Sequence, residues 1–241
     1  MIDNRKKKSA MILSANKANR LYWLGRYAER GYLMLHLMRR AYDEVLDAPC
    51  GVEPYSEFLK KLDVYVANDM AVTDQIMSQI YEPETVTSLR RVIEMMMDNA
   101  IVLRAEIHSE SFSYIELCRT LIRGKAELEE KNITELQPIT DWLLAFWGSI
   151  RERVHGETYE LLEIGRLVEH LDMNVRFDYK FYRLAESWDV LSKYIGLRPS
   201  TFDRIQSARL AILMADETAY DAHDVDNKAR ILSALNQLVL V

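Results

Sequence analysis

One stretch near the N-terminus places Gly25 and three charges among apolar residues, and it reads Leu21-Tyr-Trp-Leu-Gly-Arg-Tyr-Ala-Glu-Arg-Gly31. On a helix that turns about 100° per residue, the apolar side chains of this stretch and of the residues after it fall into two opposite sectors. Neither side is a clean polar face, and a helix that is apolar nearly all round is usually buried. Arg26 and Glu29 are therefore predicted to be partly buried. Buried charges need partners, which the chain must supply elsewhere.

A second stretch repeats this pattern later in the chain. Leu161-Leu-Glu-Ile-Gly-Arg-Leu-Val-Glu-His170 matches the first stretch at Leu, Gly, Arg and Glu, and Gly165 lies 140 residues after Gly25. A glycine inside a helix costs about 1 kcal/mol relative to alanine. Because both copies keep it, we predict that it lets two helix backbones approach closely. The sequence thus predicts an internal pseudo-repeat whose two helices cross.

A pseudo-twofold crossing would bring the charges of the two copies together. Arg26 would then pair with Glu169, and Arg166 with Glu29, in reciprocal bidentate ion pairs. Two interpretations stay open. In the structural one, the pairs only fix the register of a helical bundle. In the functional one, the Arg and Glu side chains and His170 line a pocket for an anionic or zwitterionic ligand, because bundle cores often hold such sites.

Composition predicts an all-α fold. The chain of 241 residues contains only 8 Gly and 5 Pro, which favours long helices with few turns. Apolar periodicity predicts an antiparallel bundle of six to seven helices over residues 14–46, 55–81, 85–121, 134–150, 158–194, 200–214 and 225–240. The segment 85–121 fits either one long helix or a kinked pair. We predict a disordered basic tail over residues 1–12 and a single helical domain over residues 13–241.

Several classes of function are disfavoured. A net charge of −6 argues against a nucleic-acid coat. Cys50 and Cys118 form no CxxC pair, and the N-terminus has no apolar signal region, so a cytoplasmic location is expected. No window approaches about eighteen uninterrupted apolar residues, so no membrane span is expected. Glu152-Arg-Val-His155 has Glu-x-x-His spacing without a second copy, so neither a metal nor any other cofactor is predicted.

The chain resembles the bacterial alpha-E family, which is named for a helical domain with a Glu-Arg motif. The resemblance spans residues 12–195 and rests on three blocks: Leu21 to Arg30 preceded by Ser14 and Asn19; Asp98-Asn-Ala100 followed by Arg104; and Ile164 to His170 with Trp188-Asp-Val-Leu191. The chain departs from the family pattern at three places. His170 stands where the second Glu-Arg has Arg, Asp98 stands where Glu is expected, and the C-terminal Pro-Arg-Ser segment has no counterpart.

The resemblance implies a function in peptide ligation or tailoring. Members of the family typically accompany an ATP-grasp amide ligase of circularly permuted type, so it implies a helical accessory subunit of such a ligase, with a peptide substrate as a second partner. No nucleic acid or membrane is expected as a partner, and a homo-oligomer is left open. The alternative is an enzyme with an Arg/Glu cluster that binds an anionic or amino-acid-like substrate. Its site would comprise Glu29 and Glu169 for proton transfer and, for ligand binding, Arg26, Arg30, Arg166 and His170. A scaffold without a small ligand is a third hypothesis.

Overall fold

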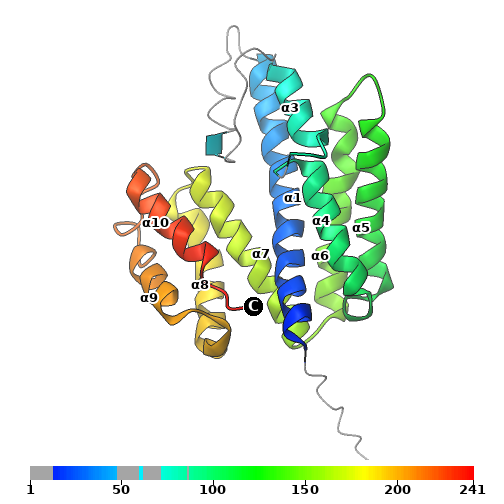
Figure 1. Ribbon diagram of the computed structural model, residues 1–241. Helices are drawn as coiled ribbons and strands as arrows, with labels where there is room; N and C mark the ends of the chain where they lie inside the picture. Colours follow the sequence, from blue (N-terminus) through cyan, green and yellow to red (C-terminus); the bar gives the residue numbers. More distant parts are fainter. Residues whose placement is uncertain (1–12, 48–59, 62–71, 86) are drawn as a thin grey trace, which may run out of the picture.

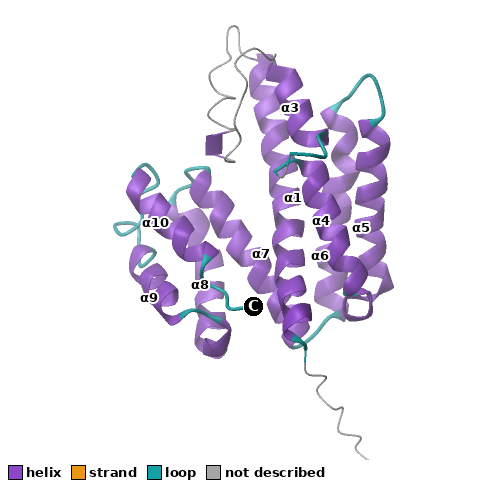
Figure 2. Ribbon diagram, in the orientation of Figure 1, coloured by secondary structure: helices purple, strands orange, loops and turns teal. Residues whose placement is uncertain are grey.

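The computed structural model describes residues 13–47, 60–61, 72–85 and 87–241, and the regular elements in this part of the chain are helices joined by loops, apart from one isolated bridge between Phe202 and Val239 (Figure 2). The all-α prediction is confirmed. The α-helices are α1 (Ala15–Asp47), α3 (Val72–Tyr81), α4 (Leu89–Val102), α5 (Arg104–Ala126), α6 (Gln137–Arg153), α7 (Glu157–Arg176), α8 (Phe181–Leu197), α9 (Arg204–Leu213) and α10 (Val225–Asn236). Two short 3₁₀ helices, η1 (Ile133–Leu136) and η2 (Pro199–Thr201), precede α6 and α9.

The 33-residue α1 stands between two groups of helices (Figure 1). On one side it packs against α3, α4 and α6, and α5 completes that bundle by contacting α4 and α6. On the other side it packs along α7, which in turn contacts α8 and α10. The two groups therefore meet where α1 lies against α7.

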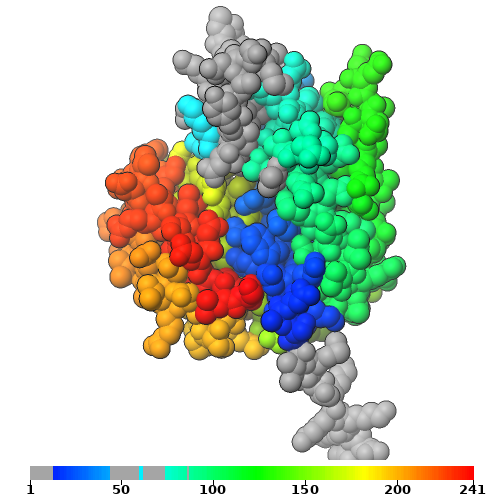
Figure 3. Space-filling model, in the orientation of Figure 1, coloured from blue at the N-terminus to red at the C-terminus, as the bar shows by residue number. Residues whose placement is uncertain are grey.

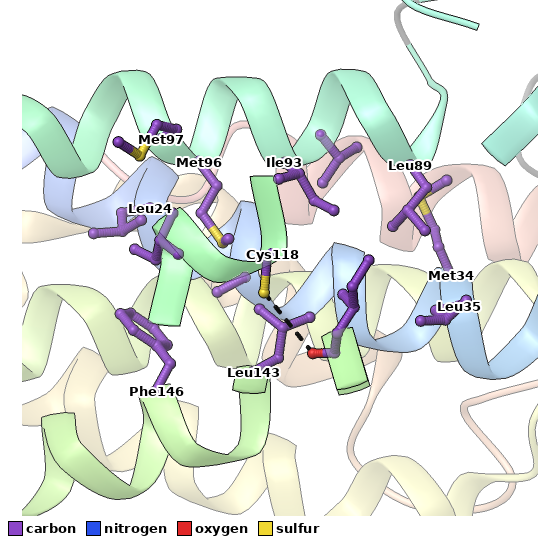
Figure 4. Close-up of a cluster of buried hydrophobic side chains, with 14 of the residues drawn as sticks. Leu24, Met34, Leu35, Leu89, Ile93, Met96, Met97, Cys118, Leu143 and Phe146 are labelled. Atoms are coloured by element: carbon purple, nitrogen blue, oxygen red, sulfur yellow. Dashed lines mark hydrogen bonds between the residues drawn. The ribbon is translucent and has the colours of Figure 1, made fainter. Parts of the chain in front are cut away.

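Each group of helices has its own hydrophobic core. The first core draws side chains from α1, α3, α4, α5 and α6, and Figure 4 shows Leu24, Ile93, Cys118 and Phe146 gathered in it. The second core is built from α7 to α10 and takes Tyr22 from α1. Most of the helices bury one apolar face, whereas α1 and α7 contribute buried side chains to both cores, as the absence of a clean polar face predicted for α1.

Side-chain caps define the starts of three helices. Ser88 Oγ accepts a hydrogen bond from the backbone N–H of Arg91 at 3.1 Å, at the start of α4. Asp203 caps α9 in the same way, and Asp224 caps α10 by accepting from the N–H of Asp226 at 2.9 Å. The acidic turn over residues 221–226 thus supplies the N-cap of α10, because the carboxylate of Asp224 accepts hydrogen bonds from the free N–H groups at the helix start.

Two predicted helices are each divided, so the described residues form nine α-helices where six to seven were predicted. The predicted helix over 158–194 is wrong as one helix, because α7 ends at Arg176 and α8 begins at Phe181. Asp178 lies in this link with φ of 58°, a left-handed conformation that Asp tolerates better than most residues. Of the two possibilities for 85–121, the kinked pair is confirmed, with a break at Leu103.

Some predicted features lie outside the described residues. These are the basic tail over 1–12 and most of the helix over 55–81. The first helix is predicted to begin near Ser14 or Asn16, and this start is confirmed, because α1 begins at Ala15. None of the helices in the described part of the chain combines the length and hydropathy that a bilayer crossing requires.

Candidate functional site

The helices α1 and α7 cross in direct backbone contact at Gly25 and Gly165. A Cβ placed on Gly25 would lie far closer to the carbonyl oxygen of Leu162 than the 3.0 Å that real Cβ atoms keep, and 3.2 Å from the nitrogen of Arg166. A Cβ on Gly165 would meet the carbonyl oxygen of Tyr22 in the same way. The contacts are reciprocal, because each carbonyl belongs to the residue three positions before its own glycine. The predicted close approach and its pseudo-twofold symmetry are confirmed.

A three-residue ion cluster lies beside this crossing. Glu169 Oε2 accepts a hydrogen bond from Arg26 Nε at 2.7 Å, and Glu169 Oε1 accepts one from Arg30 Nε. The Glu169 side chain is 1% exposed and that of Arg26 is 4% exposed. The predicted Arg26–Glu169 pair is confirmed, but it is not bidentate, because each carboxylate oxygen contacts a different arginine.

Burial and pairing act against each other on the ionisation of this cluster. Burial alone would raise the pKa of Glu169, but the guanidinium groups of Arg30 and Arg26 outweigh it and hold that pKa below its usual range. Burial would likewise lower the pKa of Arg26, yet the Glu169 carboxylate holds it above its usual range. Both groups are therefore charged at neutral pH.

Further contacts fix the Arg26 guanidinium. Its Nη1 and Nη2 atoms each lie 3.4 Å from Asn236 Oδ1, at the end of α10. The guanidinium carbon lies 5.0 Å from the centre of the Trp23 ring, within cation–π range. Figure 3 shows the end of the chain, in red, lying against α1, in blue. The C-terminal segment thus helps to enclose the crossing.

The reciprocal pair predicted between Arg166 and Glu29 is wrong. Arg166 pairs instead with Glu163 on its own helix, with Nε at 2.9 Å from Oε2 and Nη2 at 2.5 Å from Oε1. The cause is a difference between the two copies of the repeat. The second copy has Glu163 at the position where the first copy has Trp23. A carboxylate one turn away therefore satisfies Arg166.

The Glu29 carboxylate contacts His170. Glu29 Oε1 lies 2.8 Å from His170 Nδ1, and this pair mirrors the contact between Glu169 and Arg30. A carboxylate next to Nδ1 favours the tautomer that carries the proton there and leaves Nε2 as an acceptor. His170 is 28% exposed and Arg30 is 27% exposed, whereas Glu29 is 6% exposed. Solvent therefore reaches the cluster at His170 and Arg30.

Sequence reasoning missed a buried acid beside this cluster. Asp172 is fully buried, and its Oδ2 accepts a hydrogen bond from Arg176 Nε at 2.6 Å. Its Oδ1 has no hydrogen-bond partner within the described residues. Burial and the nearby Glu169 charge raise the pKa of Asp172. Its position one turn after Glu169 could have indicated it, whereas nothing in the sequence near Asn236 points to its contact with Arg26.

Other reactive groups take no part in the cluster. Burial raises the pKa of the Cys118 thiol to about 12, so the thiol is not a ready nucleophile. Glu152 and His155 are exposed at the end of α6. Across the described ranges, no three potential metal-ligating side chains gather at one place.

The comparisons with known proteins give one match. The Alpha-E family, described as "A predicted alpha-helical domain with a conserved ER motif", matches residues 13–234. No curated protein and no solved structure matches the chain. The first copy of the repeat carries an ER dipeptide at Glu29-Arg30, next to the glycine crossing. Because the match covers most of its length, the chain belongs to the Alpha-E family.

Proposed function

We propose that this chain is a helical accessory subunit that works with an ATP-grasp-type amide or peptide ligase in the cytoplasm and helps to present the peptide substrate. The class of partner follows from the family resemblance of the Leu21 to Arg30 stretch and its two companion blocks. The role of a subunit, as opposed to a catalyst, is supported by how the charges at the crossing are paired.

The observation that carries the proposal is the complete pairing of Glu169. Both of its oxygens accept hydrogen bonds from arginines, and its pKa is held below the usual range. A general acid or base needs a reachable oxygen and a pKa near the working pH. Glu169 has neither, and its interactions join α1 to α7. The paired charges therefore favour a structural task for Glu169, Arg26 and Arg30.

A second candidate function is an enzyme whose base is His170. The observation that favours it is the 2.8 Å contact between Glu29 and an imidazole that solvent reaches. In this case His170 would move the proton, Glu29 would hold the imidazole, and Arg30 would contact an anionic or amino-acid-like substrate. Glu29 would then be a positioning residue.

Reconstitution with the ligase tests both candidates. The chain is purified from its native host, the proteins that accompany it are identified, and ATP-dependent product formation by an ATP-grasp ligase among them is measured with and without the chain. The accessory role predicts that product formation falls when the chain is omitted and stays within about twofold with the Glu29→Gln variant. Glu152→Gln, an exposed change on α6, is the matched control.

The outcomes separate the two functions. A loss of about 100-fold or more in product with Glu29→Gln, while the fold and the ligase complex persist, would assign acid–base chemistry to this pair. The absence of any ATP-grasp protein among the co-purified chains, or a ligase that works equally well alone, would contradict the accessory role.

A further inference from the structure

A polar cavity of about 470 Å³ lies where α3 ends and α4 begins. Its walls come from α3, the link to α4, the start of α4, the end of α5 and the link before η1. In Figure 1 these segments meet at the upper end of the first helix group. No residue of the α1–α7 crossing lines this cavity.

Charges of both signs line the cavity from different segments. Asp74 belongs to α3 and Glu82 follows it, whereas Arg90 belongs to α4 and Lys131 to the link after α5. Within the described residues no ion pair joins any two of these four side chains. Lys131 Nζ lies 5.7 Å from the centre of the Tyr81 ring, which forms part of the same wall. Two acids and two bases thus border one space without neutralising each other.

We infer that this cavity binds a small zwitterion, an α-amino acid whose ammonium group lies toward Asp74 and Glu82 and whose carboxylate lies toward Arg90 and Lys131. A lone anion would meet two carboxylates and a lone cation two bases, so only a molecule with both charges complements the full set. The volume falls within the usual range for small-molecule sites, roughly 300–1,000 Å³.

Apolar atoms of the lining suit the rest of such a ligand. Met77, Pro83 and Ala126 contribute them. An uncharged side chain of the amino acid therefore has apolar surface to contact, in keeping with sites that combine apolar walls with a few placed polar groups. The inference does not depend on the proposed partnership with a ligase.

Binding measurements on the full chain test the inference. Each of the twenty protein L-amino acids is added at about 10 mM, and the melting temperature is recorded, because a ligand that binds the folded state raises it. The amino acid with the largest effect is then titrated by calorimetry beside its N-acetyl derivative, which lacks the ammonium, and its methyl ester, which lacks the carboxylate.

Variants locate the site. Asp74→Asn and Arg90→Gln remove one charge of each sign, and Lys131→Gln in the link repeats the test if Arg90→Gln lowers the helix content. Asp189→Asn and Arg151→Gln, both exposed and outside the cavity, are the matched controls. A lost charge-assisted hydrogen bond corresponds to an affinity change of about tenfold or more.

The expected result is saturable binding of a free amino acid. The affinity should fall about tenfold or more for each derivative and each cavity variant, and stay within about twofold for the controls. The inference is overturned if no amino acid binds saturably, if the N-acetyl derivative or the ester binds as tightly as the free amino acid, or if the cavity variants bind like the controls.

Discussion

Two carboxyl groups one turn apart on α7 respond to burial in opposite ways. Glu169 is charged because Arg26 and Arg30 take both of its oxygens. Asp172 has one arginine contact and one oxygen without a hydrogen bond, and it faces the negative charge of Glu169. The difference between them follows from the number of cationic donors that each side chain reaches, because desolvation opposes ionisation in both.

Asp172→Asn is expected to make the protein more stable, relative to the natural chain, as the pH rises. The pKa of Asp172 is raised in the folded state, so the folded protein binds more protons than the unfolded chain above the usual pKa of an aspartate. Its contribution to stability is thus largest below that value and is lost as the pH rises through the folded pKa. Urea unfolding at about pH 4 and about pH 8 measures the difference. If the free energies of unfolding of the variant and the natural chain differed by the same amount at both pH values, the raised pKa of Asp172 in the folded state would be contradicted.

Glu169→Gln is expected to lower the free energy of unfolding by about 3–5 kcal/mol at neutral pH, because the buried Arg26 and the partly exposed Arg30 lose their counter-charge. The pKa of Glu169 is lowered in the folded state, so this contribution is present above the usual pKa of a glutamate and is lost as the pH falls through the folded value. The control is Glu110→Gln, whose exposed ion pair with Arg153 should contribute under about 1 kcal/mol. If the two variants lost equal amounts of unfolding free energy, the buried cluster would contribute no more to stability than an exposed ion pair.

At the scale of helices, the arrangement of the chain depends on where helices break. The α7–α8 link is held by Asp178, whose carboxylate pairs with Lys61 at 2.6 Å and with Lys228 of α10. A break also occurs inside α5, where His108 has φ of 65° and ψ of 158°. This region of backbone space is essentially restricted to glycine. An aspartate or a histidine does not by itself mark the end of a helix in a sequence. Apolar periodicity therefore predicted one uninterrupted helix over 158–194.

His108→Gly is expected to raise the free energy of unfolding by about 1 kcal/mol or more, because glycine adopts this backbone conformation without strain. The comparison is Ser109→Gly, the neighbouring exposed helical position, which should lower stability by about 0.5 kcal/mol. Chemical denaturation of both variants measures the two effects. If His108→Gly destabilised the protein as Ser109→Gly does, the kink would carry no strain.

For the whole molecule, the sequence predicted the junction of the two helix groups better than the site around it. The two glycines predicted the crossing because each lowers the stability of its own helix, and a close contact between the two backbones explains why both copies keep it. Arg26 and Glu169 followed from the same symmetry. Arg166 did not, because the copies differ at Trp23 and Glu163, and sequence symmetry cannot choose between two carboxylates within reach. The cavity between α3 and α4 was not predicted, since its residues come from separate segments without a shared motif.

The central claim is that α1 and α7 meet backbone to backbone at the paired glycines, and Gly165→Ala tests it most directly. Gly148 is the matched control, because it is also helical but has no atom within 4 Å of an added Cβ. Gly148→Ala should raise the free energy of unfolding by up to about 1 kcal/mol. Gly165→Ala should lower it by about 2 kcal/mol or more, since the helices must separate. A Gly165→Ala variant as stable as Gly148→Ala would contradict the account.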